Sequence, residues 1–209
     1  MIRSQEDLKY HLEADRLALG GQWHRPFTRP WLANLMFPHE IWRFEILLRK
    51  LEYLHNRERT LGVSVRKVLL NRKYLKVSRE LGFSMPVNVF GPGLNIAHCG
   101  TIVVNSAAKV GSNCRIHVCV NIGTEAGYSD KAPQIGDNVY IGPGAKIFGE
   151  ITIADGCAIG ANAVVNKSFL EPNSVIAGVP ARKIGEVDTN QILVRATEVL
   201  KARGWVYKG

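Results

Sequence analysis

Two of the six histidines, His98 and His117, lie beyond residue 85 and are 19 residues apart. An imidazole titrates close to neutral pH, so it can accept a proton from a hydroxyl group and act as a general base. If this part of the chain winds into coils of about 18 residues, His117 falls beside His98 on the neighbouring coil. Because His117 follows the aliphatic Ile116, its side chain is expected to point outward, toward a cleft.

The four cysteines offer a second chemistry, that of thiolates and metal ligands. None of Cys99, Cys114, Cys119 and Cys157 forms a CxxC pair, which argues against a zinc ribbon or a thioredoxin-like site. We expect four free, small and half-buried residues in a reducing compartment. Cys99 beside His98 invites a thiolate mechanism, but adjacent residues of an extended segment point to opposite faces, which disfavours it.

The segments that must position the histidines have an aliphatic residue at every sixth position. This spacing holds for Val104, Val110, Ile116 and Ile122 and, after a gap, for Ile135, Ile141, Ile147, Ile153, Ile159 and Val165. A period of six is too long for an alternating strand and is not helical. It is typical of a triangular coil whose three short sides each place one aliphatic residue inside, so we predict a mainly β, parallel β-helix.

Corners and interruptions of this period are also visible. Glycine follows the aliphatic residue at Gly111, Gly123, Gly136, Gly142 and Gly160, which suits a corner that needs positive φ or close backbone approach. The period breaks between Ile96 and Val104, which are eight residues apart, and between Ile122 and Ile135, which are thirteen apart. We expect loops at both breaks, and loops on one face of a repeat structure often form its binding face.

The N-terminal part has a helical pattern instead. Ser4 and Asp7 predict a capping-box start of a first helix. Residues 20–37 contain Gly and Pro and are interpreted as a connection. Leucine and other apolar residues at steps of three and four predict a second helix over 41–54, and a third is expected from Val65 to about Leu81.

We therefore divide the chain into an N-terminal helical region (1–85), a β-helix (86–185) and a C-terminal segment (186–209). The C-terminal segment is expected to form a helix from Thr189 to about Arg203, which could cap the open end of the β-helix.

Charge and hydropathy restrict the possible partners. The net charge is +9, and residues 1–85 hold 16 Lys and Arg against 9 Asp and Glu. Such a basic region could contact a membrane surface or an anionic glycan, or it could be a solvated helical surface; no nucleic-acid motif accompanies it, so no nucleic acid is expected. The sequence has no apolar run long enough to span a bilayer and no apolar signal core at its start, so a cytoplasmic location is expected.

Residues 86–185 resemble the hexapeptide-repeat acyltransferases, specifically the serine acetyltransferase branch. The resemblance rests on AHCGTIVVN around His98, on VNIGTEAGYSDKAPQIGDNVYIGPGAKIFG, and on the closing AGVPARKIG. It implies a left-handed β-helix, an exception to the usual right-handed crossover. It also implies a homotrimer or a dimer of trimers, with acetyl-CoA bound as co-substrate in the cleft between neighbouring β-helices.

The resemblance also assigns residues to roles. His98 aligns with the catalytic histidine, the general base of a direct acetyl transfer from acetyl-CoA to a hydroxyl group. The predicted acceptor-binding residues are His117, Asn121, Tyr128 and Asp130, and Asp130 or Glu125 would orient His98. The predicted CoA-binding residues are Gly144, Ala145, Ala161, Asn166, Lys167, Arg182 and Lys183: small residues that let pantetheine approach the backbone, and basic residues that pair with phosphates.

Three departures from the serine acetyltransferase pattern bear on the acceptor. Phe83 stands where these enzymes have the aspartate that orients the histidine, Ala97 replaces the aspartate just before it, and Ala132 replaces a second substrate histidine. We therefore predict a saccharide acceptor, as in the related enzymes of capsule and exopolysaccharide biosynthesis.

Other functions stay open at this point. L-serine is the alternative acceptor, and a non-catalytic trimeric scaffold is a further alternative. A metal site is not expected, because zinc at a trimer interface needs three histidines and the repeat offers two.

Overall fold

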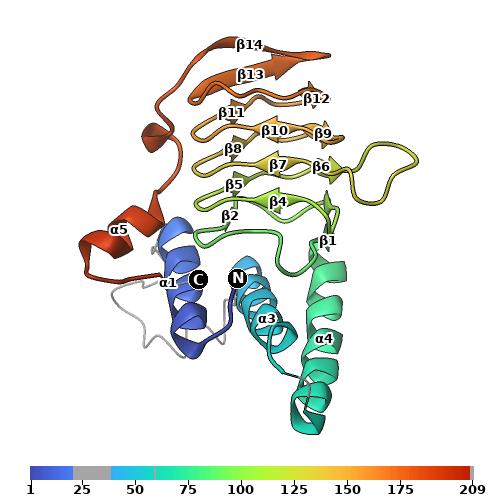
Figure 1. Cartoon of the computed structure of the whole chain (residues 1–209), viewed down its shortest axis with the longest axis vertical. Coiled ribbons are helices and arrows are strands. Elements are labelled where there is room, and N and C mark those ends of the chain that lie inside the picture. Colours follow the sequence, from blue (N-terminus) through green and yellow to red (C-terminus); the bar gives the residue numbers. More distant parts are fainter. Residues whose placement is uncertain (21–38, 59, 208–209) are drawn as a thin grey trace.

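Helices and a stack of β coils form the two parts of the molecule, as the computed structural model in Figure 1 shows. The structure describes residues 1–20, 39–58 and 60–207, so the connection expected over 20–37 lies outside it from residue 21 onward. The helices are α1 (Gln5–Ala18), α3 (Glu40–His55), α4 (Leu61–Leu81) and α5 (Ala196–Ala202), with a 3-10 turn η1 (Thr189–Gln191).

The strands are short and follow one another around the coil. In the described chain they are β1 (Phe83–Ser84), β2 (Asn95–Ile96), β3 (Ile102–Val104), β4 (Lys109–Val110), β5 (Arg115–Ile116), β6 (Val120–Gly123), β7 (Gln134–Ile135), β8 (Tyr140–Ile141), β9 (Lys146–Phe148), β10 (Thr152–Ile153), β11 (Ala158–Ile159), β12 (Val164–Val165), β13 (Ser174–Gly178) and β14 (Ala181–Glu186). The sequence boundaries drawn at 85 and 185 stay predictions.

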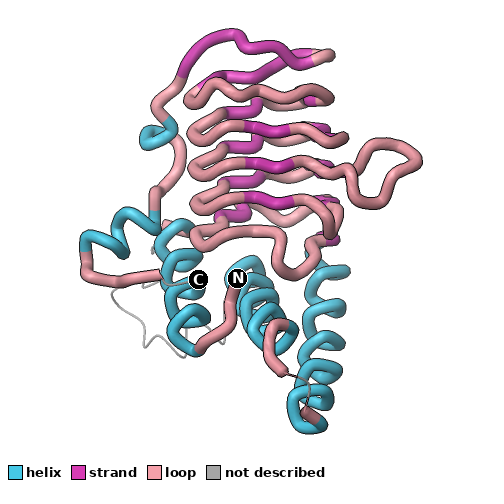
Figure 2. The backbone as a smooth tube through the Cα atoms, in the orientation of Figure 1, coloured by secondary structure: helices cyan, strands magenta, loops and turns pink. Residues whose placement is uncertain are grey.

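The sides of the coil are three sheets of stacked strands (Figure 2), ordered β1-β3-β6-β9-β12, β4-β7-β10 and β2-β5-β8-β11-β13-β14 in the described chain. The strands pair in parallel except for β13 and β14, and Ile116 pairs with Ile96 on one side and Ile141 on the other. The ten aliphatic residues at the six-residue spacing are all buried, each at most 4% exposed. The predicted left-handed parallel β-helix is confirmed.

The corners are tight because successive coils touch through their backbones. A Cβ atom on Gly142 would lie 2.7 Å from the carbonyl oxygen of Ile159 on the next coil, so this position needs glycine for close approach. Positive φ occurs at other corner residues, among them Asn113 (57°) and Asn138 (58°). Asparagine tolerates this left-handed conformation better than most side chains.

Both breaks in the six-residue spacing are loops. The first, residues 97–101 between β2 and β3, contains His98. The second, residues 124–133 between β6 and β7, projects from the side of the stack (Figure 1). The rest of the stack keeps its register on either side of each loop, so the loops carry side chains away from the core without disturbing it.

The helical part confirms the predicted capping box, because the Ser4 hydroxyl accepts from the Asp7 N–H (3.0 Å) and the Asp7 carboxylate accepts from the Ser4 N–H (2.9 Å). The predicted start of the third helix at Val65 is wrong. The helix α4 begins at Leu61, because the Thr60 hydroxyl caps it by accepting from the Val63 N–H (3.3 Å). Gly62 and Ser64 have low helix propensity and concealed this first turn.

A buried ion cluster joins the helices to the first coil. Arg49 of α3 donates to Asp15 of α1 (2.7 Å) and to Glu52 (3.0 Å), and all three side chains are almost fully buried. Arg49 also donates to the carbonyl oxygens of Phe90 (2.8 Å) and Gly91 (2.6 Å) at the start of the β-helix. The cluster therefore fixes α1 and α3 against the lower end of the stack.

The predicted C-terminal helix is confirmed, but it spans only Ala196–Ala202, after the 3-10 turn at Thr189–Gln191, and its predicted place on the last coil is wrong. The last coil ends in the antiparallel hairpin β13–β14, and the chain then runs back along the stack so that α5 lies beside α1 at the opposite end (Figure 1). Ala196 and Leu200 of α5 pack with Tyr10 and Ala14 of α1 in a small hydrophobic cluster.

Among the described helices, none combines the length and apolar character that a bilayer crossing requires.

Candidate active site

His98 lies in the loop between β2 and β3, and its side chain is exposed. The two extra residues of this loop let it bulge outward. Gly100, with a φ of 141°, turns the chain back toward β3, and its N–H donates to the Leu81 carbonyl (3.0 Å). The loop thus presents an imidazole on the outside of the first complete coil. Phe83, which replaces the orienting aspartate of the serine acetyltransferase pattern, is buried edge-to-face against Phe44 (5.0 Å between ring centroids).

His117 lies on the next coil, directly after β5. Its ring centroid is 5.9 Å from that of His98 and 5.1 Å from that of Tyr140 on β8. The structure therefore brings together the two histidines that the spacing placed on neighbouring coils. The side chain of His117 is half-buried rather than fully exposed.

The surroundings of His117 keep its ring neutral. Burial lowers the pKa of His117, and its electrostatic interactions with Arg115 and then with His98 lower it further. Its Nε2 atom is buried and has no hydrogen-bond partner among the described residues. A neutral imidazole in this state offers a lone pair as a hydrogen-bond acceptor.

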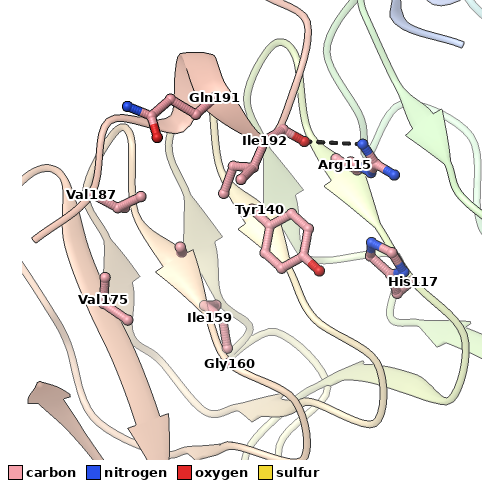
Figure 3. A pocket seen from close by; sticks show the side chains of 10 residues that line it. Arg115, His117, Tyr140, Ile159, Gly160, Val175, Val187, Gln191 and Ile192 are labelled. Carbon is pink, nitrogen blue, oxygen red and sulfur yellow. Dashed lines mark hydrogen bonds between the residues drawn. The ribbon is translucent and has the colours of Figure 1, made fainter. Parts of the chain in front are cut away.

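A cavity of about 540 Å³ opens beside these rings (Figure 3). Its polar lining comes from Arg115, His117, Tyr140 and Gln191, and its apolar lining from Ala158, Ile159, Val175, Val187 and Ile192. Figure 3 shows the Tyr140 hydroxyl directed toward His117, and Arg115 donating from Nη1 to the Ile192 carbonyl (3.0 Å). The returning C-terminal segment therefore forms one wall of the site.

Sequence reasoning missed Arg115 and Tyr140 as site residues. A signal was present, because Arg115 and His117 flank the inward Ile116 and must both point outward. The pairing of Arg115 with Tyr140 in the β5–β8 register could not be read from the sequence. The thirteen-residue interruption conceals which residue of the next coil lies opposite β5.

The predicted acceptor-binding residues other than His117 lie on a different side of the coil. Asn121 is half-buried on β6, whereas Tyr128 and Asp130 are exposed on the projecting loop. The Tyr128 ring lies under Lys131 (3.9 Å from Nζ to the ring centroid), and Lys131 pairs with Glu125 (3.5 Å). The described contact of Glu125 is therefore within the loop, and the roles predicted for these residues stay predictions.

The predicted CoA-binding residues lie on the coils above His98, between β8 and the end of the stack. Gly144, Ala161, Asn166, Lys167 and Arg182 are wholly or partly exposed there. Ala145 is different, because its side chain is buried in the core and leaves only its backbone for a ligand. Lys183 pairs with Glu171 and with Glu186 (3.1 Å), so two carboxylates already neutralise its charge.

The cysteines divide into two buried and two exposed thiols. Cys114 and Cys157 are buried and Cys99 and Cys119 are exposed, and all four are free. Burial, followed by the charge of Glu40, raises the pKa of the Cys99 thiol, which makes it a poor nucleophile at neutral pH. In the described residues, no three His, Cys, Asp or Glu side chains are grouped as a metal site would need.

The sequence matches known proteins in the same region. Residues 132–167 match the family model described as bacterial transferase hexapeptide (six repeats). The chain is 39% identical over 102 residues to a serine acetyltransferase of Mycobacterium tuberculosis, covering 48% of this chain and 44% of that protein. It is 36% identical over 107 residues to the serine acetyltransferase of Escherichia coli K12, covering 51% and 39%. The chain thus spans less than half the length of these curated relatives.

Solved structures extend the similarity to most of the chain. The structure of serine acetyltransferase from Brucella abortus strain S19 in complex with coenzyme A aligns with a TM-score of 0.68 at 28% identity, covering 88% of this chain and 70% of that one. The serine acetyltransferase of Neisseria gonorrhoeae aligns with a TM-score of 0.67 at 26% identity, covering 88% and 68%. This chain therefore carries the hexapeptide repeats of bacterial transferases on the fold of serine acetyltransferases.

These comparisons correct the predicted acceptor. The relatives and structural neighbours reported above are serine acetyltransferases, so the prediction of a saccharide acceptor is wrong and its alternative, L-serine, is favoured. The prediction gave three replaced side chains more weight than the similarity of the whole coil. Contact with a membrane or an anionic glycan finds no support in these comparisons.

Proposed function

We propose that this chain is an acetyl-CoA-dependent serine O-acetyltransferase in which His98 is the general base. The observation that carries the proposal is the position of His98, exposed on an inserted loop of a hexapeptide-repeat β-helix. The similarity to serine acetyltransferases, including one solved with coenzyme A, supports the donor and the acceptor.

The chemistry needs one proton acceptor and one site for negative charge. The neutral imidazole of His98 takes the proton of the serine hydroxyl as its oxygen attacks the thioester carbonyl carbon. The tetrahedral intermediate carries an oxyanion, which backbone N–H groups of the coil can stabilise. Its collapse breaks the carbon–sulfur bond, and the imidazolium returns its proton to the departing CoA thiolate.

The coils above His98 suit a long, anionic co-substrate. Small exposed residues such as Gly144 and Ala161 allow pantetheine to lie against the backbone, and Lys167 and Arg182 can pair with phosphates. We propose that the molecule acts as a homotrimer with acetyl-CoA between neighbouring β-helices. Val103 (39% exposed) and Phe148 (37% exposed), on the β1-β3-β6-β9-β12 sheet, give that sheet an apolar surface for such packing.

The acceptor end of the site differs from the serine acetyltransferase pattern. Ala132 is buried and Ala97 is half-buried, so neither they nor Phe83 can pair with the charges of serine. Arg115 is the cation that lines the cavity next to His117, and a guanidinium binds a carboxylate well. Serine recognition is therefore proposed to rest on groups of the cavity rather than on the three replaced positions.

A thiol-release assay with acetyl-CoA tests this proposal. We expect release of CoA with L-serine and much less with D-serine, or with N-acetylglucosamine and nucleotide sugars as comparison acceptors. Mass spectrometry should then find O-acetylserine. Binding of acetyl-CoA without release on any serine would retain the donor and disprove the acceptor, whereas absence of acetyl-CoA binding would disprove both.

A further inference from the structure

Three side chains on successive coils form a continuous contact at the site. His98, His117 and Tyr140 lie in this order, with ring-centroid separations of 5.9 and 5.1 Å. The hydroxyl of Tyr140 is directed toward His117 (Figure 3). None of the three is a carboxylate, which distinguishes this arrangement from a histidine paired with an acid.

A histidine that acts as a base needs a partner for its second ring nitrogen. One nitrogen must be unprotonated to accept the hydroxyl proton, so the other carries a hydrogen that requires an acceptor to fix the tautomer and the ring orientation. Phe83 cannot supply one, and Glu125 is paired with Lys131 within the projecting loop. Among the described residues, the aromatic ring next to that of His98 is the ring of His117.

We propose that His117 is the positioning residue of His98, accepting a hydrogen bond from its ring N–H in the place usually taken by a carboxylate. The geometry supports this, because the two rings are tilted by 57° on adjacent coils and the exposed His98 side chain is free to rotate toward its neighbour. The proposal rests on the proposed acetyl transfer for its kinetic effect but not for the contact itself.

In the proposed contact, the acceptor atom of His117 is its Nε2. This atom is buried without a described partner, and leaving a buried polar atom unpaired costs free energy that a hydrogen bond from the His98 ring N–H would recover. The groups that face the ring are Arg115 from its own strand, Tyr140 from β8 and His98 from the loop. Burial, followed by the charge of Arg115, lowers the pKa of His117 and favours its neutral form.

Steady-state kinetics separate positioning from acceptor contact. We expect His117→Ala to lower kcat roughly 10–100-fold, less than loss of the base itself, while KM for L-serine and for acetyl-CoA stays the same. His117→Gln should restore part of kcat, because its amide oxygen can accept the same hydrogen bond. A raised KM for serine at unchanged kcat would overturn the proposal and make His117 an acceptor contact.

Nitrogen-15 NMR of the histidine rings tests the same contact without any reaction. In the free protein we expect one His98 tautomer, and in His117→Ala a mixture of two, with the melting temperature close to that of Gln134→Ala, an exposed control on β7. Identical tautomer populations in both proteins would overturn the proposal. If serine is not acetylated at all, the proposed function fails, but this measurement still decides the role of His117.

Discussion

Asp15 on α1 and Arg49 on α3 form an ion pair of 2.7 Å in which both side chains are fully buried. Asp15 also accepts from the N–H groups of Gly93 (2.8 Å) and Leu94 (2.9 Å) in the first coil. One carboxylate therefore binds two helices and the β-helix together. A charge in such a place is stabilised by its partners and becomes costly when any of them is removed.

Asp15→Ala is expected to lower the free energy of unfolding by about 3–5 kcal/mol, because it removes one of the two carboxylates paired with the buried Arg49 and the acceptor of the Gly93 and Leu94 N–H groups. Urea unfolding followed by circular dichroism measures this. Lys76→Ala is the control, since Lys76 and Glu80 form an exposed pair at 3.9 Å whose loss costs at most about 1 kcal/mol. Equal losses for the two variants would show that the buried cluster contributes no more than a surface pair.

His11 is expected to make the fold sensitive to acid. Burial, with the charge of Arg49 as the next cause, lowers the pKa of His11 to about 3. Below about pH 6.5, His11 binds a proton in the unfolded chain but not in the folded protein. Its contribution to the free energy of unfolding is therefore fully present above that pH and is lost as the pH falls below it. The loss reaches roughly 2 kcal/mol at pH 5. In His11→Gln, the difference in unfolding free energy between pH 7.5 and pH 5 should shrink by about this amount; an unchanged difference would contradict the assignment.

His98→Ala should abolish acetyl transfer, with a loss of about 10²–10⁴-fold in kcat, while acetyl-CoA still binds. Isothermal titration with acetyl-CoA and the thiol-release assay measure the two properties separately. Cys99→Ala is the matched control on the same loop and should keep its activity, because the Cys99 thiol is protonated at neutral pH. Full activity of His98→Ala would disprove the mechanism.

Gly142→Ala is expected to destabilise the stack by roughly 1–3 kcal/mol, because its new Cβ meets the backbone of the next coil at Ile159. Gly62→Ala on α4 has open space around the new Cβ and should stabilise the protein by about 0.5–1 kcal/mol. Thermal unfolding of both variants gives the comparison. An equal change for the two substitutions would show that the close approach at Gly142 does not limit this position.

The sequence was most informative where the structure repeats. The period of six predicted the buried positions and placed His98 and His117 on neighbouring coils, because each coil contributes the same number of residues. It was least informative where burial depends on distant partners. Arg49 looks like a surface charge of an amphipathic helix, and its partner Asp15 and the carbonyl of Gly91 come from other elements.

The site shows the same division. His98 stood out because it lies in a break of the period, whereas Arg115 and Tyr140 are ordinary outward residues of the repeat. Their pairing depends on which residue of the next coil lies opposite, and the projecting loop shifts that count. The place of α5 was also hidden, because an amphipathic pattern does not specify the surface on which a helix packs.

The return of the chain along the stack changes how the β-helix should unfold. A linear array of repeats can fray from its free end, one unit after another. Here the segment after β14 is bonded to lower coils through Arg115 and Ile192 (3.0 Å) and through Asn113 and Thr197 (2.7 Å), and it ends against α1. The returning segment thus connects the top and the bottom of the array, in addition to the hydrogen bonds between successive coils. The coils should therefore lose amide-exchange protection together instead of one after another.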